Sequence, residues 1–496
     1  MSPADDTEDR KLPEGWASAS VLELAELIRG VSYAKGEERR DPFAGGVPLL
    51  RANNIREELV PDDILYVPQS RVSDYQMLRG GDVMLAMSSG SKSVVGKAAL
   101  VRKPIEAAFG AFCGVLRPCT NIDGVFFGYW FQTSGYRVAV SEKSAGVNIN
   151  NLKRSDFEAL EMPLPPLPEQ RRIVESVDGL LERVNGAKER LARVPKIMKR
   201  FRQSVLAAAC SGRLTADWRE QHPDLEPASV LLDRIRAERK AALGKKYKEP
   251  EPVNPDELPE LPEGWEWVAM GTCFAVCIGS TPSRAKPEYW RGDIAWISSG
   301  EVQFCRIARA AECITQLGLD NSSTKLNPPG TVLLGMIGEG RTRGQAAILD
   351  IPACNNQNCA AIRVSATDIP PEYVYYWLWS QYEATRQVGA GNEQPALNKS
   401  RVEQLPIPVP PLPEQREIVR RVEALFALAD AIEKRVAAAT ARAEQITQSI
   451  LAKAFRGELV PSEAELARAE CRAYEPAAAM LERVRRTSAP VKRNRR

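Results

Sequence analysis

The most constraining feature of this chain is a long internal repeat. The segment PLPEQRRIV at 166–174 recurs as PLPEQREIV at 411–419, an offset of 245 residues. The segment LPEGW at 12–16 likewise recurs at 261–265. This period is too long for a solenoid, so the chain contains two copies of one unit, a globular domain followed by a helix. We expect an approximate internal two-fold axis, which suits a partner that itself presents two sites.

Each half opens with LPEGW and reaches a proline-rich hinge, MPLPP at 162–166 or IPVPP at 407–411. Residues before proline favour extended conformations, so we expect these hinges to be non-helical. Between opening and hinge, short β-branched and aromatic runs alternate with turn signals, which predicts a mixed α+β domain in each half. The predicted strands are 82–87 with 98–101 and 331–336 with 346–349, and the predicted aromatic-rich helices are 126–132 and 374–379.

After each hinge, hydrophobic residues recur in alternating steps of four and three. This 3.5-residue spacing predicts a coiled-coil seam, in two helices of about 40 residues and ~60 Å each. We expect them to pair antiparallel with each other; the alternative is that each packs only on its own domain. Pro195 predicts a local kink, Pro168 and Pro413 suit a first helical turn, and Gly212 and Gly457 suit helix ends. The predicted seam residues are Ile173, Val177, Leu180, Val184, Leu191, Ile418, Val422, Leu425, Ile432 and Val436.

The predicted fold class is therefore α+β, with two mixed α/β domains in a pseudo-two-fold repeat, separated by two long antiparallel coiled-coil helices. The predicted boundaries are a disordered leader at 1–11, a first domain at 12–165, a central helical region at 166–236, a linker at 237–260, a second domain at 261–410, a second helical region at 411–460, and a C-terminal helical segment with a basic tail at 461–496.

The composition is that of an ordinary soluble protein, with 44% hydrophobic and 26% charged residues. No apolar run approaches the ~18 residues that a membrane span needs. The net charge of +3 is small for a protein that neutralises many phosphates by itself. Either nucleic acid is not the partner, or the basic surface is local and partly supplied by other subunits.

The potential ligands and nucleophiles do not form a duplicated site. The pairs Cys273/Cys277 and Cys354/Cys359 lack matched zinc spacing, and the one histidine, His222, lies far away. We therefore expect no metal site, and free thiols in a reducing cytoplasm. A Walker-like segment at 335–342 has arginine in place of the phosphate-binding lysine. The chain is duplicated, but no catalytic cluster is duplicated with it. We therefore predict that the chain is not an enzyme.

A small basic loop follows the same strand in both halves, at 88–97 and 338–345. Glycine permits close backbone approach, Lys and Arg can bind phosphates, and Gln, Ser and Thr can reach base edges. An ordinary solvated hairpin loop is the alternative. A polar stretch at 355–358 is a further candidate, whereas 148–153 and 394–399 suit local capping. The candidate DNA-contacting residues are Lys92, Ser93, Lys97, Arg341, Thr342, Arg343 and Gln345, with Arg51, Asn53 and Asn54.

These motifs together resemble the specificity subunit of Type I restriction–modification enzymes. The resemblance covers about 12–485 and includes RQSVLAAACSGRL at 202–214 with its echo QSILAKAFRGEL at 448–459. It implies two target recognition domains, each binding one half of a bipartite, asymmetric DNA sequence. It also implies an antiparallel helical spacer that sets the gap between the half-sites, and no catalytic centre on this chain.

The resemblance further implies the partners and cofactors. The expected partners are double-stranded DNA, two methyltransferase (modification) subunits and two restriction/translocase subunits, in the cytoplasm and without a membrane. No cofactor is expected on this chain, whereas S-adenosylmethionine, ATP and Mg²⁺ are expected on the partner subunits. The alternatives are a coiled-coil scaffold protein without DNA readout and a self-sufficient DNA methyltransferase. Retention of DNA in the presence of methyltransferase distinguishes a specificity subunit from a scaffold. Cofactor binding by the isolated chain would indicate a self-sufficient methyltransferase.

Overall fold

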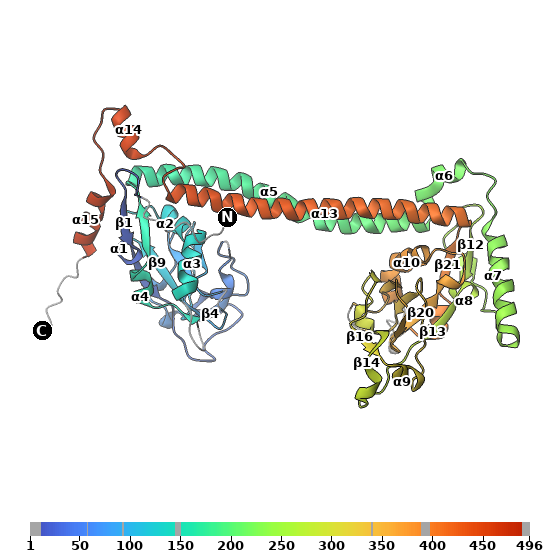
Figure 1. The fold of residues 1–496 in the computed structure, drawn as a ribbon. Coiled ribbons are helices and arrows are strands. Elements are labelled where there is room, and N and C mark those ends of the chain that lie inside the picture. Colours follow the sequence, from blue (N-terminus) through green and yellow to red (C-terminus); the bar gives the residue numbers. More distant parts are fainter. Residues whose placement is uncertain are drawn as a thin grey trace. The chain divides into compact units, whose positions relative to one another are not determined.

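The computed structural model describes residues 11–56, 58–91, 94–143, 150–338, 341–387 and 397–488. Residues 1–10 of the predicted leader (1–11), residues 489–496 with the basic tail, and a few loop residues lie outside this set. The chain forms two compact units that divide between Ala192 and Arg193 and between Val436 and Ala437. Unit 1 combines both ends of the chain, and unit 2 is its central part. Two long helices, α5 (Leu167–Cys210) and α13 (Leu412–Phe455), each contribute to both units (Figure 1).

Domain 1, the α/β part of unit 1, contains two sheets and two short strand pairs, one of which is β6 (Ser88–Ser89) with β10 (Asn150–Asn151). The four-stranded sheet has the order β2 (Ala25–Arg29), β9 (Cys113–Pro118), β5 (Val83–Ala86) and β7 (Ala98–Leu100). The three-stranded sheet has the order β4 (Leu65–Pro68), β3 (Gly46–Leu50) and β8 (Ala108–Phe109). The pair β1 (Ala17–Ser20) and β11 (Glu161–Leu164) joins the LPEGW opening to the hinge.

Domain 2, the α/β part of unit 2, repeats the two sheets with one further strand. Its larger sheet has the order β13 (Ala275–Ile278), β20 (Cys359–Arg363), β17 (Val332–Gly335), β18 (Ala346–Leu349) and β15 (Cys305–Ile307). The second sheet is β16 (Glu312–Ile314), β14 (Trp290–Ile297) and β19 (Ala353–Asn355), and β12 (Glu266–Ala269) pairs with β21 (Pro406–Val409). The predicted strand pairs are β5 with β7 and β17 with β18, so these predictions are confirmed.

The aromatic-rich segments are helices, as predicted, and they join each domain to the long helices. They are α2 (Gly124–Trp130) in unit 1 and α10 (Pro371–Ser380) in unit 2. The Phe126 ring lies 4.9 Å from that of Phe455 in α13. In unit 2, α10 lies between the sheet and α13 (Figure 1), and the Tyr376 and Trp379 rings lie 5.7 and 5.4 Å from Phe426. Buried aromatic contacts of this kind bring a large apolar area to the junction.

Within each unit the two long helices pack antiparallel, as predicted. In unit 1, the first turns of α5 and the last turns of α13 share one core, which contains Ile173, Val177, Leu181, Ile450, Leu451 and Phe455. In unit 2, the last turns of α5 and the first turns of α13 share another, which contains Val205, Leu206, Ile418 and Val422. Ion pairs link the helices, with 2.5 Å between Lys188 Nζ and Glu444 Oε2 and 2.9 Å between Arg202 Nη1 and Glu433 Oε1. The alternative in which each helix contacts only its own domain is wrong.

The predicted seam is buried unevenly. Ile173, Val177, Ile418 and Val422 are at most 1% exposed, whereas the remaining six predicted positions are half-buried: Leu180, Val184, Leu191, Leu425, Ile432 and Val436. Leu181 and Ala429 are buried instead, and Ile446, which continues the heptad pattern, is 43% exposed. A straight helix drifts by about 20° per heptad relative to a 3.5-residue repeat, so the buried face rotates away from the predicted positions.

The helix ends follow the sequence signals. Pro168 and Pro413 lie in the first turns, and α5 continues through Pro195 as one helix. Gly212 and Gly457 follow the helix ends with φ of +71° and +72°, values that suit glycine. The predicted linker at 237–260 begins too early, because α7 (Ala228–Leu243) extends into it.

The remaining described α-helices are shorter, with at most 12 residues each. They are α1 (Val21–Leu24), α3 (Ser134–Lys143), α4 (Arg154–Glu158), α6 (Ala216–Glu220), α8 (Met270–Cys273), α9 (Gln316–Asp320), α11 (Tyr382–Gln387), α12 (Lys399–Glu403), α14 (Glu463–Ala469) and α15 (Ala477–Ser488). Of the described helices, none is long and apolar enough to cross a membrane.

Candidate nucleic-acid interface

The basic loop after the central strand is closed by the same hydrogen bonds in both domains. In domain 1, the Ala86 N–H donates to the Lys97 carbonyl, and the Gly96 N–H donates to the Ala86 carbonyl, both at 2.9 Å. In domain 2, Gly335 N–H to Gln345 O and Gly344 N–H to Gly335 O are both 2.8 Å. The loop is therefore a repeated structural feature of the two domains.

The predicted loop residues differ in accessibility. Lys97 and Arg341 are exposed, and Thr342 and Gln345 are half-buried. Lys92 and Ser93 lie outside the described residues. The assignment of Arg343 to DNA contact is corrected: it is 9% exposed, and its guanidinium donates to the Arg386 carbonyl at 2.6 Å. Arg343 therefore anchors the end of α11, which sequence periodicity did not indicate.

The polar stretch in domain 1 contains one structural residue and two accessible ones. Asn54 is 0% exposed; its Oδ1 accepts the Arg51 N–H at 2.8 Å and its Nδ2 donates to the Val60 carbonyl at 2.9 Å. The assignment of Asn54 to DNA contact is therefore corrected to a local cap. Arg51 Nη2 and Asn53 Nδ2 lie 2.8 and 3.2 Å from Asp63 Oδ2. Exposed pairs of this kind are weak, so these two side chains remain candidates.

In the stretch 355–358 of domain 2, the first two residues are buried and have structural roles. Asn355 and Asn356 are 1% and 7% exposed. The Asn355 Oδ1 accepts from Asn327 Nδ2 at 2.9 Å and the Asn356 Oδ1 accepts the Asn358 N–H at 3.1 Å, so both side chains are used inside the domain. Gln357 is exposed. Only the second half of this stretch can therefore meet a ligand.

The structure brings these separate segments together around one turn, which sequence reasoning missed. In domain 1 the turn is 110–112; the Gly110 N–H donates to the Leu50 carbonyl at 2.9 Å, and the Phe112 carbonyl accepts the Met87 N–H at 2.9 Å. The turn thus lies between the 51–54 stretch and the basic loop. The exposure of Phe112 depends on the tertiary structure, so no local sequence signal marked this turn.

The repeat of this turn in domain 2 is 356–358, and its hydrogen bonds are equivalent. The Asn356 N–H donates to the Ile297 carbonyl at 3.0 Å, and the Asn358 carbonyl accepts the Met336 N–H at 2.8 Å. This turn lies beside 298–301 and the second basic loop. Both domains therefore present the same three-part surface: a loop, a turn, and a polar stretch that is 51–54 in domain 1 and 298–301 in domain 2.

The repeated LPEGW and PLPEQ motifs meet at a buried joint in each unit. The Trp16 indole N–H donates to Glu169 Oε1 at 2.8 Å, and the Trp265 indole N–H donates to Glu414 Oε2 at 2.9 Å. Both carboxylates are 0% exposed. Glu169 and Glu414 also lie in the first turns of α5 and α13, where an acidic side chain favours the positive end of the helix dipole. Because each pair is some 150 residues apart in the chain, at separations of 153 and 149, local patterns could not reveal the contact.

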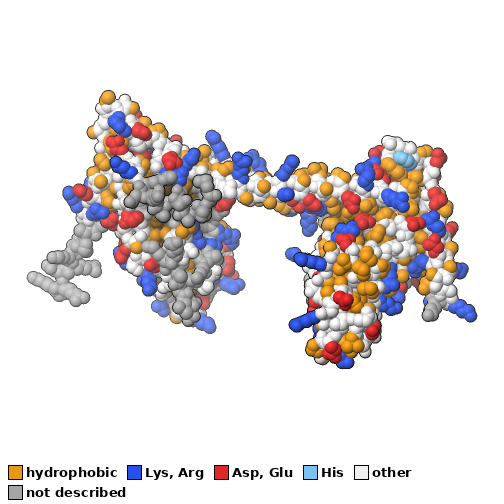
Figure 2. All heavy atoms as spheres, in the orientation of Figure 1, with side chains coloured by type: hydrophobic (Ala, Val, Ile, Leu, Met, Phe, Trp, Pro, Cys, Tyr) orange, Lys and Arg blue, Asp and Glu red, His pale blue; other side chains and the backbone are white. Residues whose placement is uncertain are grey.

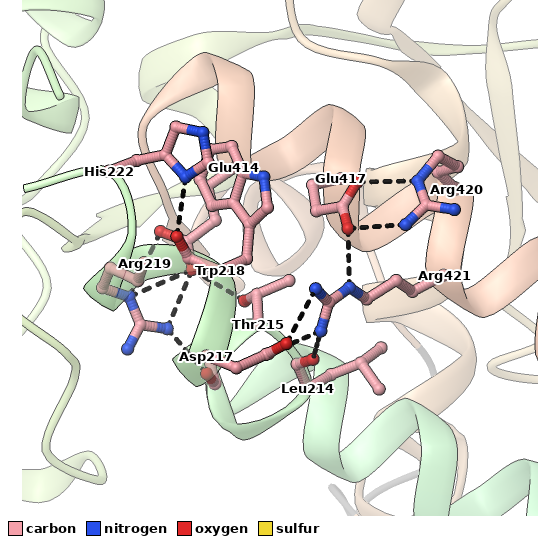
Figure 3. A network of polar contacts seen from close by, with 11 residues as sticks. Leu214, Thr215, Asp217, Trp218, Arg219, His222, Glu414, Glu417, Arg420 and Arg421 are labelled. Carbon is pink, nitrogen blue, oxygen red and sulfur yellow. Dashed lines mark hydrogen bonds and ion pairs between the residues drawn. The ribbon is translucent and has the colours of Figure 1, made fainter.

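The two joints are completed differently. In unit 1, Glu169 Oε2 accepts the backbone N–H of Glu463 at 2.8 Å, and burial raises the pKa of Glu169. In unit 2, Glu414 Oε1 accepts from Thr215 Oγ1 at 2.7 Å and from Arg219 Nη2 at 2.8 Å (Figure 3). The second joint therefore has a charged partner directly on the carboxylate.

A further network surrounds the joint of unit 2. Arg421 lies between Asp217 and Glu417, with 2.6 Å to an oxygen of each (Figure 3). The hydrogen bond from Arg420, together with that from Arg421, lowers the pKa of Glu417 to about 2. The His222 ring stacks on Trp218 with 4.1 Å between centroids. His222 thus contributes to local packing in α6.

Comparison with known proteins identifies the family. The model of the Type I restriction modification DNA specificity domain matches residues 13–195 and 262–439. The EcoKI specificity subunit of Escherichia coli strain K12 is 35% identical over 96% of each chain, as is the StySPI specificity subunit of Salmonella potsdam. The chain belongs to the family of Type I restriction–modification specificity subunits.

Solved structures share the fold of this specificity subunit. A chain from a study of complex assembly and conformational transition of the type I R-M system aligns with a TM-score of 0.64 and 19% identity, covering 91% of this chain and 100% of that chain. The HsdS subunit from Thermoanaerobacter tengcongensis aligns with a TM-score of 0.52 and 20% identity, covering 91% and 99%. The predicted fold class, a repeat of two mixed domains with two long helices, is confirmed.

The family also confirms that this specificity subunit is the non-catalytic part of its system, which works with other restriction–modification subunits and DNA. No group of three or more His, Cys, Asp or Glu in the described ranges could hold a metal ion. Burial raises the pKa of Cys113, Cys210, Cys273 and Cys359 to about 12, so these thiols are protonated at neutral pH.

The charges of the specificity subunit are mixed. On the face drawn in Figure 2, basic and acidic side chains are interspersed over each unit. This distribution agrees with the small net charge of +3.

Proposed function

We propose that this specificity subunit binds a bipartite, asymmetric DNA target, with one half-site for each domain. The observation that carries the proposal is the repeated surface of loop, turn and polar stretch. The same backbone hydrogen bonds build it in both domains, whereas its exposed side chains differ. Base recognition needs side chains on a rigid frame, and two frames with different side chains suit two different half-sites.

The proposed complex contains two methyltransferase and two restriction/translocase subunits in the cytoplasm. S-adenosylmethionine, ATP and Mg²⁺ would bind those partners, and no cofactor would bind this chain. The repeat supports two copies of each partner, because each unit has its own domain and its own joint. The mixed surface charge supports partners that supply part of the phosphate contacts. A scaffold without DNA readout would leave the paired loop-and-turn surfaces unexplained.

Replacing residues 13–160 with those of a relative of different specificity should change one half-site and leave the other unchanged. Domain 1 has its own sheets and core, so the exchange preserves domain 2. Methylome sequencing of cells that carry the hybrid with its methyltransferase measures both half-sites. The matched control replaces domain 2 at 262–405. Simultaneous change of both half-sites in either hybrid would contradict the assignment of one domain to each.

Inserting one heptad into both α5 and α13 should lengthen the unspecified gap. A heptad preserves the packing period and adds ~10 Å at 1.5 Å per residue, which corresponds to about three base pairs at ~34 Å per helical turn of DNA. Both half-sites should stay the same. Methylome sequencing gives the gap directly, and an unchanged gap would show that the long helices do not set it.

A further inference from the structure

We propose that the turn at 110–112 and its repeat at 356–358 contact bases directly. Ala111 and Phe112 would contact a thymine methyl group in one half-site, and Gln357 would hydrogen-bond an adenine in the other. The proposal rests on the proposed function and names residues that carry it. Gln357 belongs to the polar stretch 355–358 that the sequence suggested, whereas Ala111 and Phe112 are new candidates.

The turn occupies the centre of the repeated surface. In domain 1 it is hydrogen-bonded on one side to β3 through Leu50 and on the other to the start of the basic loop through Met87. In domain 2 the equivalent bonds go to Ile297 and Met336. A loop that binds phosphates beside this turn would therefore bring the turn toward the base edges.

Close packing behind the turn holds it rigidly. Gly30 and Gly279 occupy equivalent positions after β2 and β13. A Cβ at Gly30 would lie 2.1 Å from the Gly110 carbonyl oxygen, and one at Gly279 would lie 1.8 Å from the Asn355 carbonyl oxygen. Only glycine permits this approach, so both domains support the turn with backbone against backbone. A frame of this rigidity suits base discrimination.

The exposure of Phe112 is unusual for its surroundings. Its side chain is 71% exposed, the highest value among the exposed large hydrophobic residues, while Phe109 and Cys113 on either side are 0% and 2% exposed. The flanking strands are thus firmly buried and the turn is presented outward. Exposed aromatic side chains on ordered frames mark interaction sites.

The two turns present different side chains, as recognition of two different half-sites would require. Domain 1 presents Ala111 and Phe112, and apolar side chains contact the thymine methyl in the major groove. Domain 2 presents Gln357, and an amide can pair with the N6 and N7 edge of adenine. The Thr281 hydroxyl donates to Gln357 Oε1 at 2.7 Å, which orients the amide and leaves the oxygen a second lone pair.

The first test uses the specificity subunit in complex with its methyltransferase subunits and a duplex oligonucleotide that carries the target identified by methylome sequencing. Each thymine of the half-site assigned to domain 1 is replaced by uracil, which lacks only the methyl group. One such replacement should weaken binding about fourfold, the effect of one buried methyl group. The Phe112→Ala complex should bind the thymine and uracil duplexes equally, and Phe112→Leu should keep part of the difference. The control is Val138→Ala, since Val138 is 57% exposed on α3.

The second test concerns domain 2. Gln357→Ala should weaken binding about tenfold or more, the value of a bidentate amide–adenine pair. Replacing the contacted adenine by 7-deazaadenine should weaken wild-type binding and leave the variant unaffected. Asn321→Ala is the control, because Asn321 is exposed and donates only locally, to the Leu317 carbonyl of α9, which it follows.

The outcomes separate the two proposals. A Phe112→Ala complex that still discriminates thymine from uracil, or a half-site without any thymine, would overturn the assignment of the turn while domain exchange still moved one half-site. Wild-type complex without any preference for the target duplex would instead overturn the proposed function. Loss of discrimination in both half-sites from either single variant would also overturn the assignment of one turn to each.

Discussion

Glu414→Ala should destabilise unit 2 by about 3–5 kcal/mol, the usual effect of removing one partner from a buried ion pair. The carboxylate is fully buried and accepts from the Trp265 indole, the Thr215 hydroxyl and Arg219. Its removal leaves these donors without their acceptor where water has little access. Urea denaturation gives the total effect, and hydrogen exchange by mass spectrometry should place it in β12, α6 and the start of α13.

Two matched variants test the cause. Glu423→Ala removes an exposed carboxylate from the same helix and should change stability by less than about 0.5 kcal/mol. Glu169→Ala removes the equivalent carboxylate in unit 1 and should cost about 1–3 kcal/mol, because its hydrogen-bond donors are an indole and a backbone N–H. Equal losses for Glu414→Ala and Glu423→Ala would show that the joint contributes little to the stability of the unit.

Gly30→Ala should displace the 110–112 turn and abolish recognition of one half-site. The added methyl would lie 2.1 Å from the Gly110 carbonyl oxygen, far inside van der Waals contact. Relieving such an overlap typically costs about 1–3 kcal/mol and moves the backbone. We expect more than about a tenfold loss of preference for the half-site assigned to domain 1, since one mismatched base pair alone costs about 1–3 kcal/mol. Methylome sequencing and competition between target and mismatched duplexes measure this loss of preference.

The control for this variant is Gly135→Ala. Gly135 lies in α3, and a Cβ there would meet nothing within 4 Å. Alanine also favours the helix, so this change should be neutral or slightly stabilising. Gly279→Ala is the counterpart in domain 2 and should affect only the other half-site. Full target preference in the Gly30→Ala complex would show that the position of the turn does not govern recognition.

The elements that sequence periodicity predicted are those that local chemistry specifies. The central strands β5 and β17 are continuous runs of apolar residues, and all four residues in each are buried. The long helices have proline in the first turn and glycine just after the last turn, because proline fixes φ at a helical value and glycine accepts a positive φ irrespective of its neighbours. The overall prediction therefore succeeded where short-range rules apply.

The candidate contacts were predicted less well, because accessibility depends on the whole domain. Asn54 and Arg343 have suitable chemistry for DNA, yet both are buried and bonded to backbone groups. Phe112 has chemistry typical of a core and is instead 71% exposed. Local sequence cannot distinguish these cases, since burial depends on which distant strands pack around each residue.

The sequence alone determined the repeat, the class of each domain, the two long helices and the family, because identical motifs and periodicities specify identical local structures. The tertiary structure decided how these parts meet: tryptophan on buried glutamate at each joint, and loop, turn and polar stretch on one surface of each domain. These contacts join residues that are far apart in the chain. They form only when the domain folds, so local sequence patterns cannot reveal them.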